Sequence, residues 1–256
     1  MRKTLVVGNW KMYPLELSDA RKLLEGVKKG ARNLSHTEAV ICPPFIYIQP
    51  LRGEYRGKKV GFGAQDVFWE REGSFTGEVS APQLRDIDVE YVIVGHSERR
   101  ALGESDEMVN KKVKSVLKAE LTPILCFGEK KHDKEGEYLD VISDQLTSCL
   151  DGIRGADAAH IVFAYEPIWA IGGDADSAMT PHEIHQMALF IRKVLRELYD
   201  NAVSTKARIL YGGSVESTNT PALMEEANVD GFLVGHASLN ATHFNNILEA
   251  VEEYHG

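Results

Sequence analysis

Residues 161–173 read IVFAYEPIWAIGG, an apolar run that ends in one carboxylate, a proline and a glycine-rich loop. The apolar run predicts a buried β-strand with Glu166 at its carboxyl end, which is where α/β barrels carry their chemistry. The apolar wall beside Glu166 disfavours the ionised carboxylate and raises its proton affinity, which suits a general base. The alternative for this segment alone is a carboxylate that caps the strand and pairs with a lysine.

Outward from this segment, short β-branched runs alternate with amphipathic helical patterns. Strands are predicted at 5–8, 39–42, 60–64, 91–94, 123–126, 161–165, 208–210 and 231–234. Helices are predicted at 17–29, 105–119, 138–150, 180–198 and 241–254. Such alternation indicates a parallel sheet that is buried on both faces. We therefore predict an α/β protein in which residues 1–256 form one domain, a (β/α)8 barrel with eight parallel strands.

An open doubly wound sheet is the alternative architecture. It lacks support because no G-x-G-x-x-G pattern follows the first predicted strand. Helix starts are well marked, since Ser80 with Gln83 and Thr180 with Glu183 each form a capping-box pattern, and Ser105 is a predicted N-cap. No break in composition suggests a linker between domains.

Charge and cysteine content narrow the class of protein. The formal net charge of −9 argues against nucleic acid or an anionic membrane surface as the main partner. No apolar run is long enough to span a bilayer, and residues 1–5 lead into a strand without a signal-peptide pattern. The three cysteines lack Cys-x-x-Cys spacing, which suggests reduced thiols in a cytoplasmic protein. Cys126 lies at a strand end, where we interpret it as a packing residue.

Residues that follow the strands meet at one rim of a barrel. Lys11 after the first strand offers a fixed ammonium, with Asn9 as a hydrogen-bond donor beside it. His96 after the fourth strand is a candidate acid or electrophile, and Ser97 and Glu98 are placed to orient neighbours. Glycine turns at 212–213 and 235 follow the last two strands, where barrels often bind phosphate. Each of these features alone has a plain structural explanation. Lysine, histidine, glutamate and two glycine turns in this order along the strand ends together indicate an active site.

These residues lie in motifs that extend along the whole chain. The motifs are GNWKM at 8–12, GEVS at 77–80, GHSERR at 95–100, CFGE at 126–129, AYEPIWAIG at 164–172 and YGGSV at 211–215. In order and spacing the chain resembles the triosephosphate isomerase family. This enzyme is also a standard example of carboxylate chemistry assisted by a neutral imidazole.

The resemblance implies a reversible aldose–ketose isomerisation of a triose phosphate, with no cofactor and no metal. Glu166 would move the proton between neighbouring carbons, and neutral His96 would hydrogen-bond the substrate oxygens. Lys11 would supply positive charge, Asn9 would help to hold the substrate, and Glu98 would be a supporting group.

The resemblance also implies a phosphate site and a lid. Backbone N–H groups of Gly172, Ser214, Gly235 and His236 would bind the phosphate. The loop from Pro167 to about residue 178 would close over the substrate and exclude water.

Two positions depart from the family pattern. The family lid usually continues Gly-Thr-Gly-Lys, whereas this chain has GGDADS at 172–177. We predict that Asp174 and Asp176 face solvent when the lid is closed, because either would repel a dianionic phosphate. The second departure is His236, where the family normally has glycine, a residue that adopts backbone dihedrals φ unfavourable for histidine. We predict that the ring of His236 folds outward.

The family implies a homodimer formed through the loop at 65–79, in which Thr76 would reach the neighbouring site. This loop is long and carries Phe68, Trp69 and Phe75, which is consistent with an interface. The pair His182 and His185 has a spacing near that of metal ligands, but no third ligand is evident, so a surface feature is favoured.

Three other functions remain open on the sequence. An isomerase of a longer phosphosugar would use the altered lid. A Schiff-base aldolase would need a lysine at position 166, where this chain has glutamate. A phosphosugar-binding protein without activity would keep the phosphate turns but would not need both Glu166 and His96.

Overall fold

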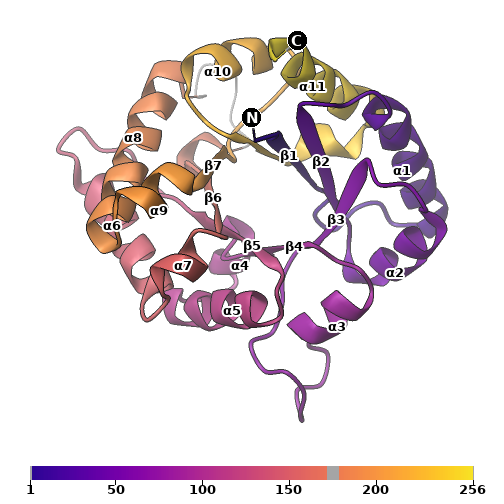
Figure 1. The fold of residues 1–256 in the computed structure, drawn as a ribbon, viewed down its shortest axis with the longest axis horizontal. Helices are drawn as coiled ribbons and strands as arrows, with labels where there is room; N and C mark the ends of the chain where they lie inside the picture. Colours follow the sequence, from indigo (N-terminus) through magenta and orange to yellow (C-terminus); the bar gives the residue numbers. More distant parts are fainter. Residues whose placement is uncertain (1, 172–178, 256) are drawn as a thin grey trace.

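The computed structural model describes residues 2–171 and 179–255, and the Asp174 and Asp176 predictions fall outside these residues. Eight parallel strands close into a barrel in sequence order, and β1 pairs with β8 to complete the ring. Helices surround the strands on the outside (Figure 1). The predicted (β/α)8 barrel is therefore confirmed.

All eight predicted strands are present. They are β1 (Thr4–Asn9), β2 (Thr37–Cys42), β3 (Val60–Ala64), β4 (Tyr91–Val94), β5 (Thr122–Phe127), β6 (Val162–Tyr165), β7 (Arg208–Tyr211) and β8 (Gly231–Val234). The largest difference from prediction is at β2, which begins at Thr37 rather than at residue 39. Periodicity located the apolar parts of the strands, and polar residues extend some of them at the ends.

The five predicted helices are also present, with shorter helices between them. The long helices are α1 (Leu17–Ala31), α5 (Asp106–Lys118), α6 (Glu137–Leu150), α8 (Pro181–Leu198) and α11 (Ala241–Tyr254). The others are α2 (Phe45–Glu54), α3 (Ala81–Asp86), α4 (Ser97–Ala101), α7 (Gly155–Ala158), α9 (Asn201–Lys206) and α10 (Thr220–Glu226), with 3-10 turns η1 (Ile168–Ala170) and η3 (His236–Leu239). None of the helices in the described part of the chain is long and apolar enough to cross a membrane.

Hydrogen bonds at the helix starts follow the predicted caps. The backbone N–H of Thr180 donates to Glu183 Oε2 at 2.8 Å, and the N–H of Glu183 donates to Thr180 Oγ1 at 3.3 Å. Gln83 accepts from the backbone N–H of Ser80 at 2.9 Å, and Ser105 Oγ accepts at the start of α5. Donors that a helix leaves free are thus satisfied by side chains.

Apolar side chains form two layers, because successive residues of a strand point to opposite faces. Leu5 and Val7 belong to the cluster inside the barrel, whereas Val6 belongs to the larger cluster between the strands and the helices. Leu5, Val6 and Val7 are all 0% exposed. This burial on both sides explains why the strands lack polar alternation and fixes the strand ends that carry the site.

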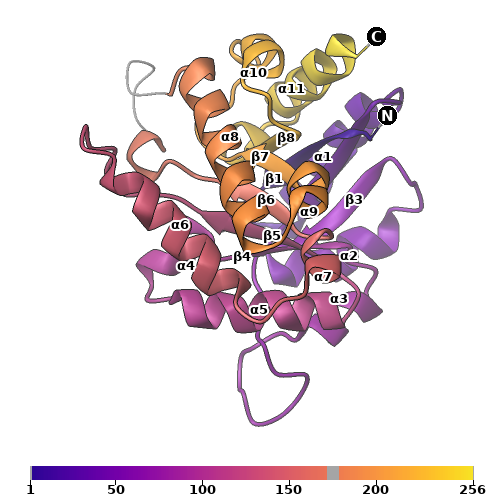
Figure 2. The ribbon, with the colours of Figure 1, turned by 60° about the vertical axis from the view of Figure 1, so that its left-hand side comes forward.

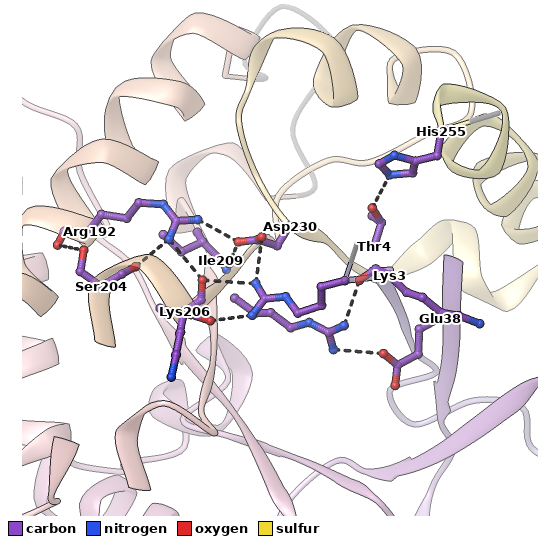
Figure 3. Close-up of polar contacts among 12 residues, drawn as sticks. Lys3, Thr4, Glu38, Arg192, Ser204, Lys206, Ile209, Asp230 and His255 are labelled. Atoms are coloured by element: carbon purple, nitrogen blue, oxygen red, sulfur yellow. Dashed lines mark hydrogen bonds and ion pairs between the residues drawn. The ribbon is translucent and has the colours of Figure 1, made fainter. Parts of the chain in front are cut away.

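Ion pairs close the barrel mouth where the strands begin (Figure 3). Asp230 accepts from Arg2 at 3.0 Å and from Arg192 at 2.9 Å, and Arg208 donates to Glu38 at 3.0 Å. Each arginine comes from a different segment, so the pairs connect β2, β7, α8 and the residues before β1 and β8. The opposite mouth, where the strands end, contains a cavity.

Glu252 of α11 binds the segment that leads into β2, and this contact predicts a pH dependence. Its carboxylate accepts from the backbone N–H groups of Ser35, His36 and Thr37 and from Ser35 Oγ. These hydrogen bonds outweigh desolvation and lower the pKa of Glu252 to about 2. A lowered pKa in the folded state stabilises the protein above the unfolded pKa of roughly 4.3, and this stabilisation is lost as the pH falls toward 2.

We therefore expect Glu252→Gln to lower the free energy of unfolding at pH 7, and the difference from wild type to shrink between about pH 4.5 and pH 2. Denaturant titrations at several pH values measure this. Glu253→Gln, its neighbour, is the control and should show no such trend. A difference that stays constant down to pH 2 would contradict the hydrogen-bonded carboxylate.

Candidate active site

The strand ends enclose a cavity of about 400 Å³. Its lining includes seven residues predicted from the sequence: Asn9, Lys11, His96, Glu166, Ser214, Gly235 and His236. Glu98 does not line the cavity but contacts Lys11. Gly172 lies outside the described residues. Residues that are far apart in the sequence thus meet in one pocket because each directly follows a strand.

Glu166 follows β6 and is 2% exposed. Its Oε2 accepts from the backbone N–H of Ser97 at 3.0 Å, and its Oε1 lies 3.2 Å from His96 Nε2. Both carboxylate oxygens are therefore engaged by the segment that follows β4. A base in this position can reach a substrate only after giving up at least one of these contacts.

Two glycines leave room for Glu166. A Cβ on Gly128 would lie 1.7 Å from the backbone oxygen of Glu166, and one on Gly212 would lie 2.9 Å from its Cγ. Real Cβ atoms do not approach backbone oxygen so closely, so no other residue fits at Gly128 without a shift of the chain. The sequence analysis assigned Gly128 no role of its own, although it follows the fifth strand and belongs to the CFGE motif at 126–129.

His96 is the N-cap residue of α4, and its Nδ1 accepts from the backbone N–H of Glu98 at 3.2 Å. A ring nitrogen that accepts a hydrogen bond carries no proton, so the hydrogen of the neutral ring is on Nε2. Nε2 faces the carboxylate of Glu166. This tautomer, assigned from the hydrogen-bond pattern, presents a donor to the cavity.

Lys11 reaches the cavity from the loop after β1. Its Nζ lies 2.7 Å from Glu98 Oε1, and its backbone N–H donates to Asn9 Oδ1 at 2.9 Å. Its φ angle is 52°, in the left-handed region that non-glycine residues rarely adopt. A conformation of this kind costs about 1–2 kcal/mol. The fold therefore holds Lys11 in an unfavourable backbone state beside the site.

The two predicted phosphate turns line the same cavity as Glu166 and His96. Ser214 is held by its hydroxyl, which donates to the backbone oxygen of Ala170 at 3.1 Å, and its own carbonyl accepts from Asn219 at 2.9 Å. A Cβ on Gly235 would lie 3.4 Å from Lys11 Cε, so the lysine side chain passes directly over this turn. Lys11 thus brings its positive charge next to backbone N–H groups that suit an anion.

His236 begins the turn η3, and its side chain is exposed. Its φ is not positive, so the backbone here accommodates histidine without strain. His236 also lines the cavity, so the outward orientation of its ring stays a prediction. We expect His236→Gly to leave KM and its pH profile unchanged, as measured by steady-state kinetics from pH 6 to pH 9. A changed profile would assign the ring a role at the phosphate.

Cys126 packs inside the barrel and is 0% exposed. Burial and the nearby Glu166 carboxylate raise the pKa of its thiol well above the ordinary value. A thiol that stays protonated is neither a nucleophile nor a metal ligand at neutral pH. This agrees with the packing interpretation of Cys126.

The histidine pair His182 and His185 lies on α8. His182 lies within hydrogen-bond distance of Gln186, at 3.0 Å. Within residues 2–171 and 179–255, no three histidine, cysteine or acidic side chains gather as metal ligands would.

Comparison with known proteins agrees with this geometry. A family model described as Triosephosphate isomerase matches residues 4–251. Proteins named triosephosphate isomerase are similar along nearly the whole chain. The one from Roseiflexus sp. (strain RS-1) is 45% identical over 250 residues, and the one from Roseiflexus castenholzii is 42% identical, each alignment covering 97% of both chains. That of Endomicrobium trichonymphae is 41% identical, over 97% of this chain and 99% of its own. The chain belongs to the triosephosphate isomerase family.

Proposed function

We propose that this protein interconverts glyceraldehyde 3-phosphate and dihydroxyacetone phosphate in glycolysis and gluconeogenesis, through an enediol or enediolate and without a cofactor. One observation carries the proposal: the Glu166 carboxylate lies 3.2 Å from His96 Nε2, and both line the cavity that also contains Lys11. A carboxylate base and a neutral donor on one small pocket are what proton transfer next to a carbonyl requires.

The steps of the reaction follow from these positions. Glu166 removes a proton from the carbon next to the carbonyl and returns it to the neighbouring carbon. His96 Nε2–H donates to the carbonyl and hydroxyl oxygens as negative charge develops on them. The ammonium of Lys11, which lines the same cavity, stabilises the same charge. Asn9 helps to hold the substrate, and Glu98 orients Lys11.

Binding of the substrate would use the phosphate turns. Backbone N–H groups of Ser214, Gly235 and His236 would hold the phosphate together with Gly172, and Lys11 would balance part of its charge. The Glu166–His96 contact would then be replaced by contacts of both groups to the sugar.

The test is a coupled isomerase assay with purified protein, using Glu166→Gln as the inactive comparison. Comparing kcat/KM for glyceraldehyde 3-phosphate and for a four-carbon phosphosugar determines the substrate length. Absence of turnover with either three-carbon phosphate would reject the proposal.

We further propose a cytoplasmic homodimer that forms through the loop at 65–79. This loop projects from the barrel between β3 and α3 (Figures 1 and 2), and Phe75 on it is 42% exposed. Large apolar side chains are also exposed on the segments after β1, β2 and β4; they are Met12, Leu15, Ile46 and Leu102. A second copy of the chain with the same surface would bury these side chains together with Phe75. Thr76 would then approach the active site of that second copy.

Phe75→Asp tests this interface. We expect the variant to sediment as a monomer and the wild type to sediment as a dimer, because a charge would be buried without a partner. Leu189→Asp on α8, where the leucine is 49% exposed, is the matched control and should remain dimeric. A wild-type protein that sediments as a monomer at micromolar concentration would reject the dimer.

A further inference from the structure

The segment that begins with Glu166 is fastened to the segment after β5 by backbone hydrogen bonds. The N–H of Glu166 donates to the carbonyl oxygen of Phe127 at 2.9 Å, and the N–H of Ile168 donates to that of Glu129 at 3.0 Å. The parallel pairing of β5 with β6 thus continues past the ends of both strands. The position of Glu166 therefore depends on where residues 127–129 lie.

The side chain of Glu129 adds a second connection to the same segment. It is buried, and its Oε1 accepts from Trp169 Nε1 at 2.7 Å and from the hydroxyl of Tyr165 at 3.0 Å. Both of these donors are neutral. Within the described parts of the chain, the other carboxylate oxygen of Glu129 has no hydrogen-bond partner. A buried carboxylate is costly unless a positive charge lies beside it.

His132 places an imidazole ring beside this carboxylate. Its Nδ1 lies 3.2 Å from Glu129 Oε1, and because a carboxylate only accepts, the ring donates from Nδ1. The ring stacks on that of Tyr138 in the first turn of α6, with centroids 3.8 Å apart, and its centroid lies 5.2 Å from that of Trp169. Of the three donors to Glu129, His132 is the one that can carry a positive charge.

Several acidic groups lie around the ring of His132. Asp133 accepts from the backbone N–H of Tyr138 at 2.9 Å and so fixes the first turn of α6. Burial raises the pKa of Tyr138, and the charges of Glu129, Asp133 and Glu183 raise it further, so the potential where the two rings stack is negative. The titratable groups on the elements around the ring are Glu129, Lys130 and Lys131 after β5, Tyr165 of β6, Asp133 and Tyr138 before and in α6, and His182 and Glu183 of α8.

We propose that His132 is a positioning residue for Glu166: its ring holds the buried Glu129 carboxylate against Trp169 and so fixes the segment that begins with the base. Because imidazoles gain and lose a proton between about pH 5 and pH 8, this hold on Trp169 should vary with pH. The sequence analysis assigned no role to position 132. The inference rests on the proposed role of Glu166 in proton transfer.

The test is His132→Phe, which keeps a ring to stack on Tyr138 but removes the donor to Glu129. Because a small displacement of a reacting group is costly, we expect kcat to fall about tenfold. KM for the triose phosphate and Kd for inorganic phosphate should stay within about twofold, since the phosphate turns are unchanged. His132→Leu removes the ring as well, and it measures the same loss if the first variant does not fold.

A second measurement follows Trp169 itself by nuclear magnetic resonance. The chain has three tryptophans, and Trp169→Phe identifies the indole N–H signal of Trp169 among them. This signal should move in the wild type between about pH 5 and pH 8, where imidazoles titrate, and should stay fixed in His132→Phe. His182→Phe is the matched control, since His182 is exposed at the start of α8. That variant should keep both kcat and the movement of the signal.

Both substitutions are also combined. In a Glu129→Gln background, which removes the charge that His132 faces, His132→Phe should have no further effect on kcat. An unchanged kcat in His132→Phe, a Trp169 signal that moves alike in wild type and variant, or additive losses in the Glu129→Gln background would overturn the inference. A wild type without isomerase activity would reject the proposed function instead, and the resonance measurement would still decide whether His132 holds Trp169.

Discussion

Glu166→Gln should lower kcat about 10³-fold, because a positioned general base contributes roughly 10²- to 10⁴-fold to a proton transfer. This loss corresponds to about 4 kcal/mol of transition-state stabilisation. The amide keeps the size of the side chain and can still occupy the space beside Gly128 and Gly212. The affinity for inorganic phosphate should stay within about twofold, since the phosphate turns are unchanged.

The control for this variant is Glu38→Gln. Glu38 lies at the opposite mouth, where it pairs with Arg208, so the variant loses an ion pair without touching the cavity. We expect its kcat to match that of the wild type. If Glu166→Gln kept more than a tenth of the activity, proton transfer would have to be assigned to another group.

Lys112→Met should lower the free energy of unfolding by about 3–5 kcal/mol, because it leaves the buried Glu104 carboxylate without its cation and leaves Asp66 with Arg99 alone. The side chain of Lys112 is 3% exposed and contacts both Asp66, 10% exposed, and Glu104, 3% exposed. Among residues 2–171 and 179–255, one oxygen of Glu104 already lacks a hydrogen-bond partner. Denaturant unfolding at a fixed protein concentration measures the loss.

The neighbouring lysine provides the control. Lys111 pairs with Glu107 at 2.8 Å, but their side chains are 48% and 77% exposed. Lys111→Met should therefore cost less than about 1 kcal/mol. Adding Glu104→Gln to Lys112→Met should recover part of the stability, because one unpaired charge is removed. Equal losses for the two lysine variants would show that burial does not govern the energetics of this cluster.

The fold could be predicted because a strand buried on both faces leaves a local signal that its own residues carry. The start of β2 was missed because Thr37 and Glu38 are polar, and the partners of Glu38 are Tyr91 and Arg208, which are distant in the sequence. Short helices such as α4 and α7 were also missed, since four or five residues are too few to show a helical period. The structure at such positions depends on contacts with residues that are distant in the sequence.

In the site, too, residues with a local sequence signal were predicted, and residues whose role depends on distant contacts were not. Glu166, His96 and Lys11 were predicted because each follows a strand and belongs to a recognisable motif. Gln65 was not assigned a role, although it also follows a strand, because its side chain contacts the backbone oxygens of Cys42 and Lys11, which are distant in the sequence. At His236 the sequence left the backbone conformation open, and the structure shows that its φ is not positive.

The pairing of β1 with β8 affects how the protein is made. On the ribosome, β1 emerges long before the strand that it must pair with at residues 231–234. During that interval the nascent chain presents two open sheet edges, and Glu252 has not yet reached residues 35–37. Open edges invite pairing with other chains. Translation speed and chaperone supply should therefore influence the yield of this protein more strongly than substitutions in its surface helices.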